Sequence, residues 1–126
     1  MKKLLILLTI FPNLTFAANC VNPENSDETL ACLNKQTQTA KIQLANAIYK
    51  TLDRFEGEDK KNFIAAQRLW VQYKEADCNF ISSFVGKADR ILVKAYKQQC
   101  ANERAIQRAI ELNSMFKESY LEYKKK

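Results

Sequence analysis

The sequence contains no histidine, and it has only two glycines and two prolines among its 126 residues. The lack of histidine removes the commonest general base, and two isolated glycines cannot build the glycine-rich loop that cradles a phosphate. So few glycines and prolines also leave few places for tight turns, which favours long helices over many short strands. The composition therefore predicts an all-α fold without a cofactor, and it argues against an enzyme.

The first 17 residues, MKKLLILLTIFPNLTFA, have the pattern of a secretory signal peptide. Two lysines precede an apolar run over residues 4–11, Pro12 ends that run, and Ala17 is a small residue suited to cleavage. The run is shorter than the roughly 20 residues that a membrane-spanning helix needs. We therefore expect that residues 1–17 are removed and that the chain does not span a membrane. Residues 18–126 are expected to form a single domain that is periplasmic or secreted from a bacterium.

The chain is mildly basic, with 20 Lys and Arg against 14 Asp and Glu and a net charge of +6. Removal of Lys2 and Lys3 with the signal would leave 18 against 14, or +4. Such a charge on an exported protein does not indicate nucleic acid, but it is compatible with weak attraction to anionic polymers or lipid headgroups. A lipid anchor on Cys20 is the less favoured alternative, because Asn19 stands where a lipoprotein signal has a small residue.

All four cysteines follow the expected cleavage point, and an even count in a small exported chain predicts two disulfides. Four cysteines allow three pairings, of which we prefer Cys20 with Cys32 and Cys78 with Cys100. The first pair would hold the polar lead-in to the first helix, and the second would join the second helix to the third. No metal site is predicted, since there is neither a CxxC motif nor a histidine.

Apolar residues recur at helical spacing in three segments, which predicts a three-helix antiparallel bundle stapled by two disulfides. The segments are residues 26–55, 59–80 and 88–120. Asn25 and Glu28 have the spacing of a capping box, and Gly57 is expected to end the first helix. The basic C-terminal end, YLEYKKK, is expected to fray.

Each of the first two helices has a row of residues that we expect to face the core. In the first helix the row is Ile42, Ala45, Tyr49 and Leu52, and in the second it is Phe63, Ala66, Trp70 and Tyr73. Two groups of residues in this region are poor candidates for catalysis. Serine and lysine side chains close together in a loop, as in Ser82, Ser83 and Lys87, are commonplace. Glu75 and Asp77 are two residues apart on a helix and therefore point to different sides.

The third segment carries its basic residues on one helical face, which we call the basic ridge. We expect it to face solvent as an ordinary charged surface or as a binding face for an anionic partner. Apolar residues on the opposite side, Leu92, Ala95, Tyr96, Ile106, Ala109 and Ile110, are expected to face the other helices. The ridge consists of Lys87, Arg90, Lys94, Lys97, Arg104 and Arg108.

Three stretches, ETLACLNKQ, NAIYKTL and AQRLWVQYKEADC, carry a family resemblance. They resemble the domain at the N-terminus of LprI-type lysozyme inhibitors. The chain departs from that family's pattern at Ile42, at Ala45 and at Lys74-Glu75, where the family tends to have Asp, Leu and Arg-Asp. The resemblance implies a binding protein that blocks a lysozyme-type hydrolase, with Gln67, Trp70 and Tyr73 as a core signature. The matching positions are Cys32, Asn46, Tyr49, Gln67, Trp70, Tyr73, Cys78 and Cys100.

Two functions follow as expectations. The first is an exported, non-enzymatic binding protein that inhibits a lysozyme-type cell-wall hydrolase by occluding its cleft. The second is an envelope interaction module that binds an anionic polymer, a lipid headgroup or an acidic protein through Arg90, Lys94, Lys97, Arg104 and Arg108. A positive net charge opposes docking to a basic lysozyme, so an inhibitor would use a local acidic patch. The candidate patches are Glu24, Asp27 and Glu28, or Glu56, Glu58 and Asp59.

Overall fold

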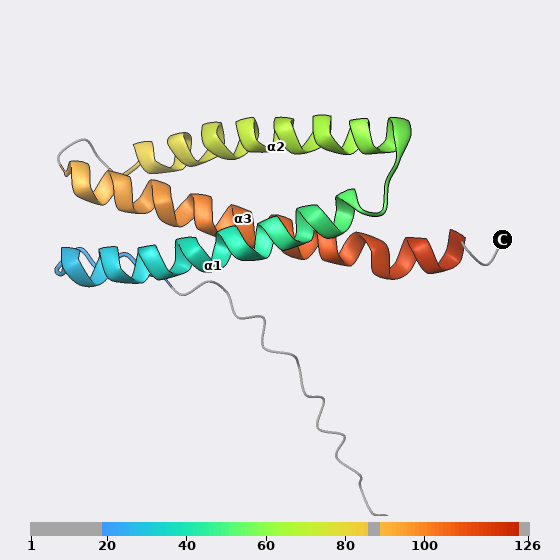
Figure 1. The fold of residues 1–126 in the computed structure, drawn as a ribbon. Helices are drawn as coiled ribbons and strands as arrows, with labels where there is room; N and C mark the ends of the chain where they lie inside the picture. The colour runs from blue at the N-terminus through green and yellow to red at the C-terminus, as the bar shows by residue number, and fades with distance from the viewer. Residues whose placement is uncertain (1–18, 86–88, 124–126) are drawn as a thin grey trace, which may run out of the picture.

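The computed structural model describes residues 19–85 and 89–123 and contains three long helices, α1 (Ser26–Leu52), α2 (Gly57–Ser83) and α3 (Arg90–Tyr123). The helices alternate in direction, and α3 lies between the other two (Figure 1). Helix α3 makes extensive contact with α1 and a smaller contact with α2, whereas α1 and α2 scarcely touch. The predicted all-α bundle is confirmed. The expected signal peptide lies outside the described residues.

The first helix begins where the sequence predicts. The side chain of Asn25 accepts a hydrogen bond of 3.0 Å from the backbone N–H of Glu28, which satisfies one free donor of the first turn. Glu28 does not complete a capping box, because its carboxylate accepts from the side chain of Asn22 at 3.3 Å. The polar lead-in is thus held against the helix by side-chain hydrogen bonds as well as by a disulfide.

Gly57 begins α2 and does not end α1, which corrects the expected role of this glycine. The first helix already ends at Leu52, and the N–H of Asp53 closes its last turn on the carbonyl of Tyr49 at 3.0 Å. Gly57 has φ of 56°, a left-handed conformation that side chains disfavour. Glycine is therefore needed where the chain changes direction into α2. At the other end, Asp89 caps α3 by accepting from the N–H groups of Ile91 and Leu92.

The contact between α1 and α3 is built largely from small side chains. Ala40 and Ala47 on α1 and Ala95 and Ala109 on α3 are each at most 3% exposed. Small residues let two helix backbones approach closely, and the larger Leu33 and Leu112 fill the remaining space; both are at most 1% exposed. Two apolar clusters result, one around Leu33 beside Cys20 and Ala95, and one around Leu112 beside Ala47 and Ala109.

A polar group sits between these clusters. Asn102 is 5% exposed, and its amide donates to the hydroxyl of Thr37 at 2.9 Å and to the side chain of Gln36 at 3.2 Å. Gln98 donates to the same hydroxyl at 2.9 Å, while Thr37 lies 2.8 Å from the carbonyl of Leu33. Because each buried group has a partner, the polar cluster fixes the register of the two helices without an unsatisfied donor.

Both predicted disulfides are present. Cys20 pairs with Cys32 and Cys78 pairs with Cys100, with Cα atoms 5.4 Å and 5.6 Å apart. The first bond holds the lead-in against α1, and the second joins α2 to α3. No helix among the described residues is long and apolar enough to cross a lipid bilayer.

The expected core row of α1 is wrong by about half a turn. Ile42 and Tyr49 are 62% and 67% exposed, and Ala45 between them is exposed. The inward face instead carries Thr29, Leu33, Ala40, Ala47 and Thr51. Most of these side chains are small, because α3 packs closely there. Ile110 of α3, expected to face the other helices, is also exposed, at 55%.

Candidate binding surface

The contact between α2 and α3 combines half-buried apolar side chains, among them Phe63 and Trp70, with polar and charged ones. Two nitrogens of Arg104 lie 2.8 Å and 2.9 Å from one carboxylate oxygen of Asp77. Arg108 donates from Nε to the side chain of Gln67 at 3.2 Å and lies 3.3 Å from the Glu111 carboxylate. In α2, only Cys78 and Ser82 are fully buried. Helix α2 is thus held to α3 by a disulfide, by half-buried apolar side chains and by a row of partly exposed polar contacts.

This arrangement corrects the expected solvent-facing basic ridge. Arg104 and Arg108 have side chains that are only 36% and 17% exposed, because they face α2. Lys97 lies 3.7 Å from Glu75 of α2. Arg90 and Lys94 are exposed, and Lys87 lies outside the described residues. The ridge therefore does not form one continuous basic surface in solvent.

The three residues of the core signature, Gln67, Trp70 and Tyr73, differ in burial. Gln67 and Trp70 are half-buried at the α2–α3 contact, and the cations of Lys74 and Arg108 lie 5.4 Å and 6.0 Å from the centre of the Trp70 ring. Tyr73 is 59% exposed, so the expectation that it belongs to the core is wrong. The row that faces α3 shares Phe63 and Trp70 with the expected row and is rotated about 40° from it. It consists of Phe63, Gln67, Trp70, Lys74, Asp77 and Ile81.

The outer side of α2 carries a row of apolar side chains that the fold leaves uncovered. We call this row the α2 stripe. Four of its members are large and well exposed: Leu69 at 65%, Tyr73 at 59%, Phe80 at 62% and Phe84 at 72%. The rings of Phe80 and Phe84 contact each other edge to face, with centroids 4.8 Å apart. The members of the α2 stripe are Ala66, Leu69, Tyr73, Ala76, Phe80 and Phe84.

The sequence analysis missed the α2 stripe, although its signal is in the spacing. Its members are three or four residues apart, the spacing of a helical face that meets another helix. The row that was expected to face inward combined two members of the stripe, Ala66 and Tyr73, with Phe63 and Trp70 of the row that faces α3. The polar residues Gln67, Lys74 and Asp77 occupy the inward face instead.

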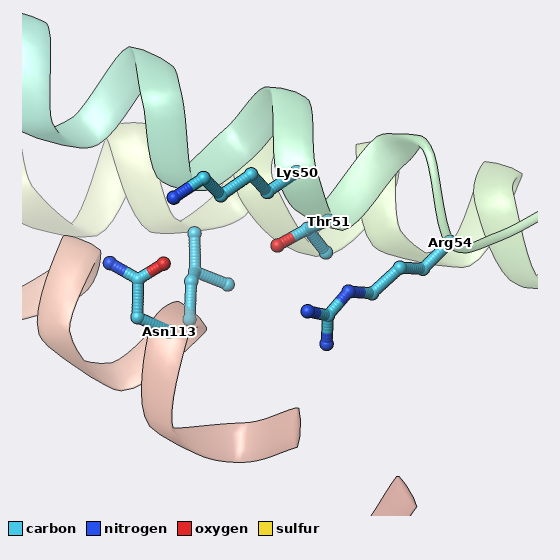
Figure 2. Close-up of a pocket in the computed structure, with 5 residues that line it drawn as sticks. Lys50, Thr51, Arg54 and Asn113 are labelled. Atoms are coloured by element: carbon cyan, nitrogen blue, oxygen red, sulfur yellow. The ribbon is translucent and has the colours of Figure 1, made fainter. Parts of the chain in front are cut away.

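Two pockets among the described residues are small. One pocket between α1 and α3 has a volume of about 20 Å³, enough for roughly one water molecule (Figure 2). Lys50 extends from α1 and Arg54 from the turn that follows it, on either side of Thr51, with Asn113 of α3 opposite them (Figure 2). A second pocket, of about 130 Å³, is lined by residues of α2 and α3 that include Ile81, Tyr96 and Glu103. Both are smaller than the roughly 300 Å³ at which small-molecule sites begin.

Asp77 lies close to the sulfur atoms of Cys78 and Cys100, all within 4.8 Å of one another. This grouping does not make a cation site. Both sulfurs are joined in a disulfide, so neither is a thiolate, and the Asp77 carboxylate is already paired with Arg104. The local chemistry is that of a structural junction, and the uncovered surface of α2 is the stronger candidate for binding.

The comparisons with known proteins place this fold in a family. The family model described as "Lysozyme inhibitor LprI" matches residues 20–114, which include α1, α2, both disulfides and most of α3. No curated protein and no solved structure matches the chain. The family and the two disulfides indicate a protein that functions outside the cytoplasm. With a match over most of its length, the chain belongs to the LprI lysozyme inhibitor family.

Proposed function

We propose that this protein is an exported, non-enzymatic inhibitor of lysozyme-type cell-wall hydrolases. The family match over residues 20–114 carries the proposal, because the matched segment contains α1, α2 and most of α3. The N-terminal signal pattern and the two disulfides support export to the periplasm or beyond. The inhibitor would act by docking on the enzyme and covering its substrate cleft.

The shape of the described surface supports docking between protein surfaces. The two pockets are too small for a sugar or a cofactor, whereas α2 presents large exposed apolar side chains. Specific protein–protein interfaces commonly have an apolar centre and a polar rim. Occlusion of an enzyme cleft by such a surface requires no catalytic group in the inhibitor.

The alternative function, binding of an anionic polymer or lipid through the basic ridge, receives less support. Arg104 and Arg108 face α2, and Asp77, Glu111 and Gln67 are their partners. Arg90 and Lys94 are the two described members of the ridge that are exposed, and a binding surface built on them alone would be small. If that surface were nevertheless the functional one, binding would weaken steeply with salt and would be lost on replacing both residues by glutamine.

The experiment that tests inhibition is a titration of the oxidised, exported protein into a lysozyme activity assay. It uses a strongly basic animal lysozyme and a less basic one, each at low and moderate salt. A stoichiometric end point that persists at moderate salt supports the proposal. An R90Q/K94Q double variant is the matched control and should inhibit as well as the wild type. Full lysozyme activity at a large excess of the protein would refute the proposal.

A further inference from the structure

We infer that the α2 stripe, together with the acidic side chains that border it, is the surface by which the protein docks on a basic protein partner. This inference rests on the proposed function and identifies its binding site, since the partner is then the hydrolase. Three observations carry it: the exposure of the stripe, its spacing, and the distribution of charge around it.

The stripe differs from the other exposed apolar side chains in that its large members line up on one face. Leu69, Tyr73, Phe80 and Phe84 are each at least 59% exposed, and they follow one another along a single helix face. From Ala66 to Phe84 the stripe is about 27 Å long, at a rise of 1.5 Å per residue. Scattered apolar residues on a surface are ordinary, but a contiguous apolar patch marks an interaction site.

The spacing of the α2 stripe defines a narrow, continuous apolar seam. Residues 66, 69, 73, 76 and 80 alternate steps of three and four, as in the contact seam of paired helices. At 100° per residue all six members fall within an arc of about 80°. No charged residue interrupts this arc between Ala66 and Phe84. The stripe therefore offers a partner an apolar strip that can be desolvated without burying a charge.

The acidic residues of α2 lie nearer the stripe than its basic residues do, except Glu75, which falls about 100° outside the arc and lies 3.7 Å from Lys97 of α3. Glu58 falls within the arc of the stripe, and Asp59 and Asp77 lie about 20° beyond its edge. Glu58 and Asp59 are exposed, whereas Asp77 is engaged by Arg104. The basic residues of α2 all lie at least about 60° outside the arc. They are Lys60, Lys61, Arg68 and Lys74.

Helix α3 adds a further acidic residue beside α2. Glu103 is exposed and lines the pocket of about 130 Å³ together with Ile81 of α2. A protein with an overall charge of +6 thus carries two exposed carboxylates, Glu58 and Asp59, beyond the N-terminal end of the stripe, while Asp77 at its edge is paired with the partly exposed Arg104. The exposed Glu58 also lies 3.3 Å from Lys61, but both side chains are about three-quarters exposed, so this pair is weak. The exposed acidic side chains therefore complement a basic partner despite the net charge.

The same charges disfavour the other occupants of the stripe. In a symmetric dimer whose two α2 helices run parallel, Glu58 and Asp59 of one copy would approach the same residues of the other. Helices that lie on a membrane surface have lysine and arginine beside the apolar face, and anionic lipids would repel Glu58 and Asp59. A basic protein surface is the occupant that both the apolar strip and its border favour.

The test replaces stripe residues with polar ones and compares them with an equally exposed pair elsewhere. An L69S/F80S variant removes two central anchors of the stripe. The control is I42S/Y49S, which removes two similarly exposed apolar side chains from the outer side of α1, at 62% and 67%. Both variants keep the buried contacts, so thermal unfolding should show that both remain folded. Binding to an immobilised basic lysozyme and inhibition of its activity are measured in parallel.

We expect L69S/F80S to raise the Kd about 100-fold, with roughly tenfold for each anchor, and I42S/Y49S to change it less than about twofold. An E58Q/D59N variant should mainly slow association, and the remaining rate should depend less on salt. Unchanged binding by L69S/F80S would overturn the docking inference while leaving inhibition intact.

The remaining outcomes separate the two proposals. If the wild type binds through the stripe but does not inhibit, the proposed function fails and the docking surface stands. If the wild type neither binds nor inhibits a basic lysozyme, both fail. Light scattering of the free protein gives the last outcome: a dimer that L69S/F80S converts to a monomer would show that the stripe serves self-association and would overturn the inference.

Discussion

The two contacts of α3 differ in chemistry although both belong to one small bundle. Toward α1 the helix presents alanines, Leu112 and a fully hydrogen-bonded Asn102, nearly all below 10% exposure. Toward α2 it presents arginines that are up to 36% exposed, and a disulfide. Full burial thus stabilises the α1–α3 contact, whereas a disulfide, polar pairs and half-buried side chains such as Phe63 and Trp70 hold α2. The helix with the least buried surface is also the one with an uncovered apolar face.

The largest change in stability is expected in the α1–α3 contact. Leu112→Ala should lower the free energy of unfolding by about 2–5 kcal/mol, because Leu112 is 1% exposed and its removal leaves a cavity beside Ala47 and Ala109. Leu69→Ala makes the same chemical change at a residue that is 65% exposed, and it should cost less than about 0.5 kcal/mol. Denaturant unfolding of both variants measures the difference, and equal losses would contradict the assignment of the core.

Loss of the second disulfide should come next. Replacing Cys78 and Cys100 together by serine opens a loop with a sequence separation of 22, and should cost about 2–4 kcal/mol. Because the other α2–α3 contacts are polar or only half-buried, we expect hydrogen exchange to rise mainly in α2. Uniform loss of protection across α1 and α3 would show that α2 is more tightly coupled to the bundle than its contacts indicate.

A smaller effect is expected at the polar cluster of the α1–α3 contact. Asn102→Ala removes the amide that donates to Thr37 and Gln36, and should cost about 1–3 kcal/mol. Thr37 keeps its hydrogen bond to the Leu33 carbonyl, and Thr39→Ala, at an exposed hydroxyl of the same helix, is the control. A stability unchanged by Asn102→Ala would mean that water replaces the lost amide.

The smallest effect is expected in the α2–α3 contact. Asp77→Asn weakens the pair with Arg104, whose side chain is 36% exposed, and should cost at most about 1 kcal/mol. The loss should shrink as salt rises, because the charges are partly solvated. A loss of several kcal/mol in chemical unfolding would show that this bridge, and not the disulfide, holds α2 in place.

Much of the fold follows from local sequence signals. The scarcity of glycine and proline, the three apolar segments and the Asn25 cap were sufficient to predict three long helices. The even number of cysteines predicted two disulfides, and the preference for the observed pairing among three rested on the positions of Cys20 and Cys32 around the start of the first helix. These features depend on neighbours along the chain, so they can be read without knowing how the helices pack.

Which side of each helix is buried could not be predicted in the same way. On α1 the large residues Ile42 and Tyr49 indicated an inward row, but close packing against α3 selects the small residues Ala40 and Ala47. On α2 the polar Gln67 and Asp77 lie inward because arginines of α3 meet them. Which apolar row is buried thus depends on the partner helix, and the α2 stripe was missed for that reason.

The two disulfides join cysteines that are consecutive in the chain, which has a consequence for how the protein matures. A chain that enters an oxidising compartment N-terminus first exposes Cys20 and Cys32 before Cys78 has arrived, so its first available pairing is the native one. Cys78 and Cys100 then find each other as the only remaining thiols. Oxidation in the order of emergence reaches the native bonds without a wrong pair to rearrange, and correct assembly places little demand on a disulfide isomerase.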